Sequence, residues 1–191
     1  MNSALKELPR CFGEGELKWT IVPPSEFALI SEQLFGLTFG AKRNKELERI
    51  DFSVLLSVRG KLSGFVTCYE HQANELYLQY GGALPEFREN PAVLRGYRVL
   101  LGFLLEHYSS LLTRIENTNT PMLKLALRCG WLIIGLRLAG NGKVLLELVN
   151  SAEQFKTSNK TPAPDSLRIS EGGGVKLSRS DAEKDLPKEE I

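Results

Sequence analysis

The side chains that could move a proton in this chain are a few carboxylates and one tyrosine near its middle. A positioned carboxylate can act as a general base, and Glu75, Glu70 and Glu86 are the candidates. Tyr80 lies between them in an apolar stretch and is the second candidate catalytic side chain. Each carboxylate has an ordinary alternative as a solvated surface charge, and His71 is expected to be solvated in a turn.

Residues 95–98 (RGYR) are of types that can bind phosphate groups. A glycine-containing loop before a helix can direct bare backbone amides at an anion, helped by the helix N-terminus. Arg95 and Arg98 can also hold phosphate through their side chains, or they can be solvent-facing charges. Asn90, followed by proline, offers a different helix start, with the asparagine as cap. If the helix begins there, Gly96 lies inside it and no amide cradle exists.

The composition argues against several classes of function. The formal net charge of the 191 residues is +1, which gives no electrostatic case for nucleic acid or an anionic membrane as partner. Cys11, Cys68 and Cys129 have no metal-ligand spacing, so we predict no metal site and a reducing compartment. The longest apolar run, 131–136, is too short to cross a bilayer, and residues 1–10 lack the apolar run of a signal peptide. The sequence therefore predicts a cytoplasmic protein without nucleic-acid or membrane partners.

Hydrophobic periodicity predicts alternating strands and helices between residues 18 and 149. Strands are expected at 18–22, 51–58, 62–69, 75–84, 112–116, 131–138 and 143–149. Helices are expected after a Ser25 cap, along an apolar face from Val93 to Leu111, and at 120–128. The pair Gly81-Gly82 marks either a bulge that opens the sheet or a strand end. This order predicts an α/β fold with a mixed, mostly antiparallel central sheet and helices on both faces.

The chain divides into two parts by composition. Residues 1–150 hold the periodic elements, with 36–50 expected as a loop, and residues 151–191 are rich in Ser, Lys, Glu and Pro. Such a segment buries too little apolar surface to offset its ordering entropy, so we predict a flexible C-terminal tail. Its alternative is a docking tail that folds on a protein partner.

The segment 119–131 (NTPMLKLALRCGW) resembles the GNAT (N-acetyltransferase) superfamily. In that family, an asparagine precedes a helix, and a glycine and an aromatic residue follow eleven and twelve residues later. Asn119, Gly130 and Trp131 fit these positions, and with the strand order the resemblance covers residues 18–149. It implies a GNAT-like acyl-CoA acyltransferase fold and transfer of an acetyl group from acetyl-CoA to an amine.

A second stretch, residues 93–101 (VLRGYRVLL), looks like an eroded form of the family's phosphate loop, Arg/Gln-x-x-Gly-x-Gly/Ala. Arg98 and Leu100 stand where that loop has small residues, and Ala126 stands where the family often has a tyrosine acid. The residues expected to contact acetyl-CoA are Leu84, Arg95, Gly96, Tyr97, Arg98 and Asn119. The side chains expected to be catalytic are Glu75 and Tyr80.

These departures favour an alternative function. A GNAT-like protein that has lost catalysis can serve as a binding or assembly factor. Small proteins of tailed bacteriophages are similar, and some of them are virion or head-assembly components, which makes the virion the alternative location. A homodimer is a further expectation from the resemblance.

Overall fold

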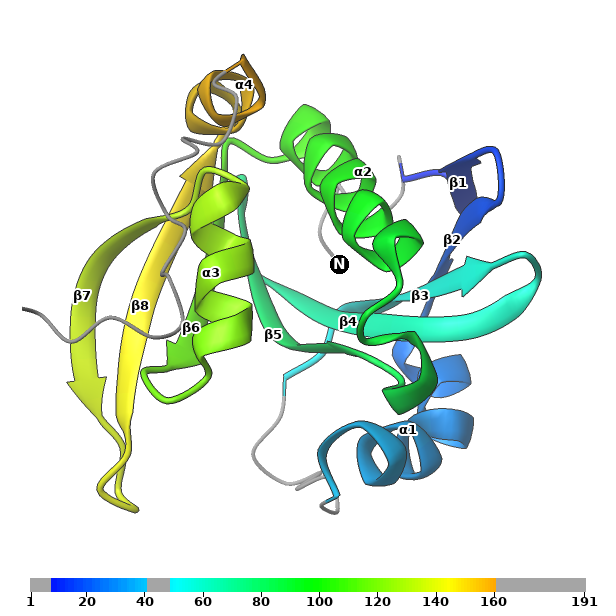
Figure 1. Cartoon of the computed structure of the whole chain (residues 1–191), viewed down its shortest axis with the longest axis horizontal. Coiled ribbons are helices and arrows are strands. Elements are labelled where there is room, and N and C mark those ends of the chain that lie inside the picture. The colour runs from blue at the N-terminus through cyan, green and yellow to red at the C-terminus, as the bar shows by residue number, and fades with distance from the viewer. Residues whose placement is uncertain (1–7, 41–48, 161–191) are drawn as a thin grey trace, which may run out of the picture.

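The computed structural model describes residues 8–40 and 49–160. Its strands are β1 (Cys11–Glu14), β2 (Leu17–Val22), β3 (Phe52–Val58), β4 (Lys61–Gln72), β5 (Glu75–Ala83), β6 (Ser110–Glu116), β7 (Leu132–Leu138) and β8 (Val144–Ser151). Its helices are α1 (Pro24–Phe39), the 3-10 turn η3 (Pro85–Phe87), α2 (Pro91–His107), α3 (Thr120–Arg128) and α4 (Ala152–Lys160). Figure 1 shows these elements around one central sheet.

The described strands form a single sheet in the order β1-β2-β3-β4-β5-β6-β8-β7. The pair β5 and β6 is parallel, and the other neighbouring pairs are antiparallel. A parallel pair needs a crossover, which α2 supplies between these two strands. The sheet is therefore mixed and mostly antiparallel, as the element order predicts.

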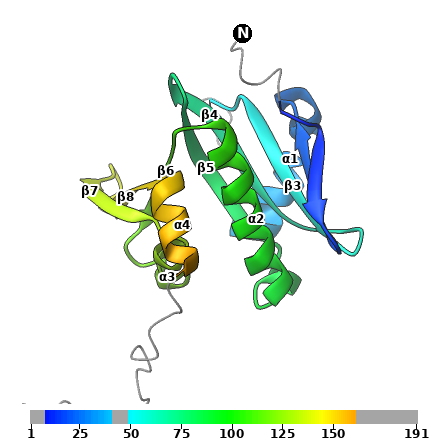
Figure 2. The ribbon, with the colours of Figure 1, turned by 90° about the horizontal axis from the view of Figure 1, so that it is seen from above.

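Helices α1 and α2 cover opposite faces of the sheet. Phe35 of α1 packs against Phe65 of β4, with ring centroids 5.5 Å apart. Gly96 of α2 lies over Leu56 of β3, which pairs with Gly64, the neighbour of Phe65. Because adjacent residues of a strand face opposite sides, the two helices lie on opposite faces, and the view in Figure 2 agrees.

The apolar stripe predicted for the central helix is buried as expected. Leu100, Leu101 and Leu104 of α2 are fully buried against the sheet. Burying such a side chain stabilises the fold by about 1.5–3 kcal/mol, so this stripe fixes the helix on its strands. The other positions of α2, including the preceding residues 95–98 that are expected to bind phosphate, are thereby fixed in direction as well.

Both boundaries of α1 differ from the sequence-based expectation. Ser25 does not cap α1, because the helix already begins at Pro24, with Pro23 at the cap position and no side-chain cap bond. The helix continues to Phe39 through the region expected to be a loop, and Gly40 ends it in the left-handed conformation. The rest of that expected loop, 41–48, lies outside the described residues.

The first residues of the predicted tail form a helix instead. Ala152–Lys160 forms α4, whose Phe155 packs against Gly102 of α2. The Gln154 carbonyl oxygen would be only 2.8 Å from a β-carbon at Gly130, so α4 also lies against the turn after α3. These contacts give the segment apolar burial that its composition alone does not indicate. The remainder of the expected tail, 161–191, lies outside the described residues.

Candidate functional site

The central feature of the sheet is the point where β5 and β6 separate. The two strands pair from Glu75 and Ser110 to Leu78 and Thr113. At the last pair, the Thr113 hydroxyl donates a hydrogen bond to the Leu78 carbonyl oxygen at 2.9 Å. Beyond it, β5 follows β4 and β6 follows β8, so the strands diverge, as Figure 1 shows. We call this place the divergence.

A β-bulge lies in β5 where the divergence begins. Thr67 pairs with Tyr80 and Cys68 pairs with Leu78, so Gln79 is the extra residue. The Tyr80 amide donates to the Thr67 hydroxyl at 3.1 Å, and the Gln79 Oε1 atom is buried without a hydrogen-bond partner in the described structure. Bulges redirect a strand and often occur near active sites. This bulge turns the second half of β5 away from β6.

Backbone amides of β5 face the side that β6 has left. The Tyr80 amide points to β4, and the Leu84 amide donates to the Ser63 carbonyl oxygen at 2.9 Å. Because N–H directions alternate along a strand, the Gly81 and Ala83 amides point into the divergence. These are the groups that could polarise a carbonyl group. Leu84, which is expected to contact acetyl-CoA, has its N–H bonded to β4 and its side chain buried, so neither group is open to the divergence.

The pair Gly81-Gly82 does not form the bulge. Both glycines pair regularly with β4, at Val66 and Phe65. A β-carbon at Gly82 would lie 2.6 Å from the Thr38 methyl carbon, so this glycine lets α1 approach the strand closely. Gly82 therefore serves helix packing, Gly81 lies close to Val66 of β4, and the opening of the sheet comes from Gln79.

The two predicted catalytic side chains lie at different ends of β5. Glu75 accepts a hydrogen bond from the Ser110 hydroxyl at 3.3 Å, where β5 and β6 are still paired. Tyr80 lies past the bulge, and its ring contacts Phe35 of α1 edge-on, with centroids 5.2 Å apart. Five strand residues separate them by roughly 16 Å, so they do not form one catalytic pair.

Helix α2 begins at Pro91, about one turn before the predicted phosphate loop. The Asn90 side chain accepts from the Ala92 amide at 2.9 Å, and the Val93 amide donates to the Asn90 carbonyl oxygen. Gly96 is inside the helix, where its carbonyl oxygen accepts from the Trp19 indole at 3.1 Å. The prediction that Gly96 supplies a bare amide is wrong, because its amide lies inside the helix.

The two arginines of α2 reach in different directions. Arg95 forms an ion pair with Glu16, in the turn between β1 and β2, at 3.0 Å. Arg98 lies on the α3 side, with one guanidinium nitrogen 3.5 Å from the Arg128 carbonyl oxygen. Burial raises the pKa of the Cys129 thiol, and the adjacent Arg98 guanidinium partly lowers it again. A single phosphate group is therefore not held by both arginines.

Arg88 is a basic residue of the site region that the sequence reasoning missed. It lies between η3 and α2 and donates to the Thr38 carbonyl oxygen at 2.7 Å. Placed at the observed helix start, the family's loop pattern puts Arg88 at its arginine, and Pro91 and Val93 at its small residues. The Asn90 cap and the proline after it were the signal that could have located this loop.

Tyr97 and Asn119 have structural roles on either side of the divergence. Burial raises the pKa of Tyr97, and the nearby Cys129 adds to the rise. Tyr97 thus fills the space between α2 and the end of α3, rather than opening a loop. Asn119 caps α3, as predicted, by accepting from the Met122 amide at 3.3 Å.

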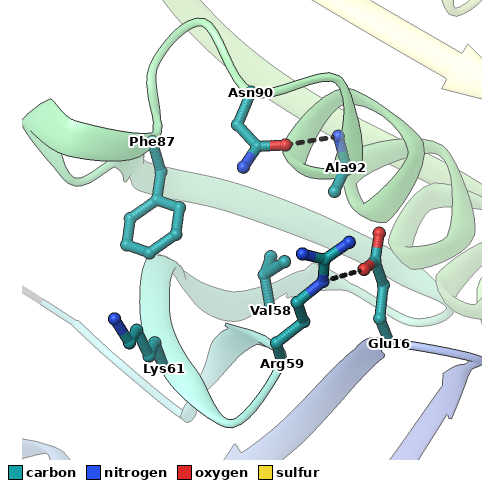
Figure 3. A pocket seen from close by; sticks show the side chains of 7 residues that line it. All are labelled: Glu16, Val58, Arg59, Lys61, Phe87, Asn90 and Ala92. Atoms are coloured by element: carbon teal, nitrogen blue, oxygen red, sulfur yellow. Dashed lines mark hydrogen bonds and ion pairs between the residues drawn. The ribbon is translucent and has the colours of Figure 1, made fainter.

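A cavity of about 270 Å³ lies at the start of α2, as Figure 3 shows. Val58 and Phe87 form part of its wall, and Arg59 reaches across it to Glu16. No residue of β6 or α3 lines it. This cavity is thus separate from the divergence. The charges of Arg59 and Glu16 in its lining are paired with each other.

The described residues hold neither a metal-binding cluster nor a membrane-spanning helix. No group of three or more His, Cys, Asp and Glu side chains in 8–40 and 49–160 could hold a metal ion. Within the same ranges, no helix is long and apolar enough to span a membrane.

Similarity to known proteins is found in structure rather than in sequence. No protein-family model matches the chain, and no curated protein matches it. The ribosomal-protein-S18-alanine N-acetyltransferase from Escherichia coli is 13% identical, with a TM-score of 0.57 over 70% of this chain and 93% of that chain. Ard1 from Thermoplasma volcanium is 11% identical, with a TM-score of 0.59 over 72% and 98%. A GNAT-family acetyltransferase from Streptococcus pneumoniae is 12% identical, with a TM-score of 0.56 over 71% and 99%.

At these identities, the similarity concerns the fold. Each of these acetyltransferases is covered almost completely, so the match extends over the whole architecture. The predicted mixed sheet with helices on both faces, and the predicted resemblance of the fold to the GNAT acetyltransferases, are confirmed. The chain has the fold of the GNAT acetyltransferases.

Proposed function

We propose that this protein transfers an acetyl group from acetyl-CoA to an amine at the divergence of β5 and β6. The observation that carries the proposal is the loss of pairing after Leu78 and Thr113, which leaves the Gly81 and Ala83 amides facing the gap. The fold shared with acetyltransferases supports it.

The reaction requires few groups from the protein. The amine nitrogen attacks the thioester carbonyl carbon, the carbon–sulfur bond breaks, and the proton lost by the amine balances the thiolate that leaves. An amide of Gly81 or Ala83 would stabilise the negative charge that develops on the carbonyl oxygen. Tyr80 is the better placed of the two proposed catalytic side chains, because it lies past the bulge, whereas Glu75 would act at a distance through water.

Arg98 is the proposed phosphate ligand for the coenzyme. It is the arginine of α2 that faces α3, and its 3.5 Å contact with the Arg128 carbonyl oxygen is at the limit of a hydrogen bond, so a phosphate group could replace it. Arg95 is held by Glu16 on the other side of the helix and serves as the matched control.

Calorimetric titration with acetyl-CoA tests the binding step directly. Wild-type protein should bind, Arg98→Ala should bind about tenfold more weakly, and Arg95→Ala should bind as the wild type does. A free-thiol assay with a panel of primary amines then tests transfer, and Tyr80→Phe should slow it without a matching loss of affinity. Absence of binding at millimolar acetyl-CoA would refute the proposal.

A second function is a binding or assembly factor without catalysis. The observation that favours it is the start of α2, where Asn90 and Pro91 leave fewer amides for a pyrophosphate group than a glycine loop would. Release of free thiol from acetyl-CoA in the presence of any amine would show that the protein is an acetyltransferase and not a factor without catalysis. The phage resemblance and a protein partner for the tail stay predictions, and residues 161–191 lie outside the described structure.

A further inference from the structure

The cavity at the start of α2 has an apolar wall and a charged mouth, as Figure 3 shows. Three buried residues form the wall, and these are Val58 (5% exposed), Phe87 (9% exposed) and Ala92 (4% exposed). Charged side chains reach the mouth from two neighbouring hairpins. Glu16 comes from the turn between β1 and β2, and Arg59 and Lys61 come from the β3–β4 hairpin. An apolar wall with a few polar groups is typical of a site for a small molecule.

The charges at the mouth do not cancel. Glu16 is shared by two arginines, since its Oε2 atom accepts from Arg59 and its Oε1 atom accepts from Arg95 at 3.0 Å. Lys61 is exposed and forms no ion pair with the residues that the structure describes. Two acids that are adjacent in the chain to lining residues do not line the cavity, and these are Glu86 and Glu89. One carboxylate against two guanidinium groups and one ammonium group leaves an excess of positive charge, which attracts anions.

Side-chain donors at the mouth have no acceptor among the described residues. Arg59 uses its Nε atom for Glu16, and Figure 3 shows its two terminal nitrogens directed toward the start of α2. Asn90 uses its Oδ1 atom for the Ala92 amide, which leaves its amide nitrogen on the side of Phe87. The first free backbone amides of α2 are used by Asn90, so side chains and not the helix end define this site. Donors without acceptors match an oxyanion.

The β3–β4 turn holds Arg59 in a backbone conformation that arginine rarely adopts. Arg59 and Gly60 form the two-residue turn between Val58 and Lys61, and both have positive φ, 50° and 75°. A turn of this kind favours asparagine, aspartate or glycine at its first position. The turn itself therefore does not call for an arginine, whereas a guanidinium group at the mouth of a cavity gives the residue a role.

We propose that this cavity binds a small organic oxyanion, with its apolar body against Phe87 and its charged group bound by Arg59, Lys61 and Asn90. The volume of about 270 Å³ is sufficient, because a cavity of about 150 Å³ already holds a benzene ring. A ring that carries a carboxylate or phosphate group therefore fits. No residue of β6 or α3 lines the cavity, so this site is separate from the one proposed for acetyl-CoA, and the inference does not depend on acetyl transfer.

Calorimetric titration of the full chain with phenyl phosphate and with benzoate is the first test, and it distinguishes the two oxyanions. At least one of the two should bind, and added sodium chloride should weaken the binding. Inorganic phosphate should bind about tenfold more weakly or less, because it has no apolar body to bury. Benzyl alcohol, which has the ring without the charge, should not bind measurably. Failure of both aromatic anions to bind at millimolar concentration, or equal binding of inorganic phosphate, would overturn the inference.

Variants then locate the site without disturbing the fold. Arg59→Asn removes the guanidinium group and places at positive φ a residue that favours it, and Lys61→Glu reverses the charge at an exposed strand end. Each substitution should weaken the binding of the aromatic anion about tenfold or more. Lys156→Gln, at an exposed position of α4, and Arg98→Ala, at the site proposed for the coenzyme, are the controls and should bind as the wild type does.

Nuclear magnetic resonance of the labelled protein gives the position of the ligand directly. The amide signals of Gly60 and Ala92 should shift as the aromatic anion is added, whereas the signal of Gly135, in β7, should stay in place. Unchanged affinity in both Arg59→Asn and Lys61→Glu, or a loss of binding in Arg98→Ala, would place the anion outside this cavity and refute the proposal.

Discussion

Replacing Gly96 with alanine tests whether the central helix begins at Pro91 and packs its second turn against the sheet. A β-carbon at this position would lie 3.1 and 3.2 Å from the two methyl carbons of Leu56, and 3.6 Å from the Trp19 ring. Leu56 and Trp19 are both buried, so neither side chain can move away easily. The position is therefore crowded on the side that faces the sheet.

Gly102 provides a matched control in the same helix. Its nearest neighbour would be a Phe155 ring carbon at 3.4 Å, an ordinary van der Waals contact. Alanine is favoured over glycine inside a helix by about 1 kcal/mol, so Gly102→Ala should stabilise by nearly that amount. At Gly96, overpacking costs about 1–3 kcal/mol and offsets this gain, so Gly96→Ala should be neutral or destabilising by up to about 2 kcal/mol.

Urea unfolding of both variants measures the difference. We expect the unfolding free energy of Gly102→Ala to exceed that of Gly96→Ala by about 1–3 kcal/mol, with melting temperatures differing by about 2–4 °C per kcal/mol. Affinity for acetyl-CoA should be the same in both variants. Equal stabilisation by the two substitutions, together with weaker acetyl-CoA binding by Gly96→Ala, would refute the packing role and restore a loop role for this glycine.

Three further predictions concern the residues around the divergence and the helix that borders it. Asn90→Ala should lower the unfolding free energy in urea by about 1 kcal/mol, because it removes the cap of α2; Asn90→Ser should restore most of that loss. Thr67→Val should cost about 1–3 kcal/mol in the same assay, because it leaves the Tyr80 amide without its acceptor at the bulge; an unchanged midpoint would mean that water replaces the hydroxyl. Burial, and after it the Asp51 carboxylate, raises the pKa of Glu70 above its usual 4.5. A carboxyl group whose pKa is higher in the native state than in the unfolded state stabilises the protein at pH values below its unfolded-state pKa. This stabilisation is lost as the pH rises through the native-state pKa, so the unfolding free energy of Glu70→Gln should increase relative to that of the wild type as the pH rises from 4.5. A stability difference independent of pH would contradict the assignment.

Local signals allowed much of the fold to be predicted from the sequence. Asn119 caps α3 and Gly130 ends it at φ 86°, because capping and left-handed stops depend on residues that are neighbours in the chain. The apolar stripe of α2 could be predicted for the same reason, because the helical spacing of its apolar residues along the chain defines one face of the helix. The order of elements then limited the architecture to a mixed sheet.

The start of α2 shows where local signals conflict. Asn90 with its proline and the stretch 95–98 both resemble helix starts, and the sequence offers no way to weigh them. Leu56 and Trp19 decide the matter, because both pack on Gly96 and the Trp19 indole donates to its carbonyl oxygen. They come from strands about 40 and 77 residues away in the chain. The arginines of that stretch then point to Glu16 and to Arg128, partners that no local pattern identifies.

The sequence by itself thus determined most of the elements, their order and the two ends of α3, since these follow from spacing and residue type along the chain. The tertiary structure decided which amides are free, which glycines serve packing, and where the sheet opens. Gln79 shows the reason: nothing in its residue type marks a bulge, and it becomes one because Thr67 takes the Tyr80 amide from the neighbouring strand. A site formed by the separation of two strands is a property of pairing, and pairing is settled between residues that are distant in the chain.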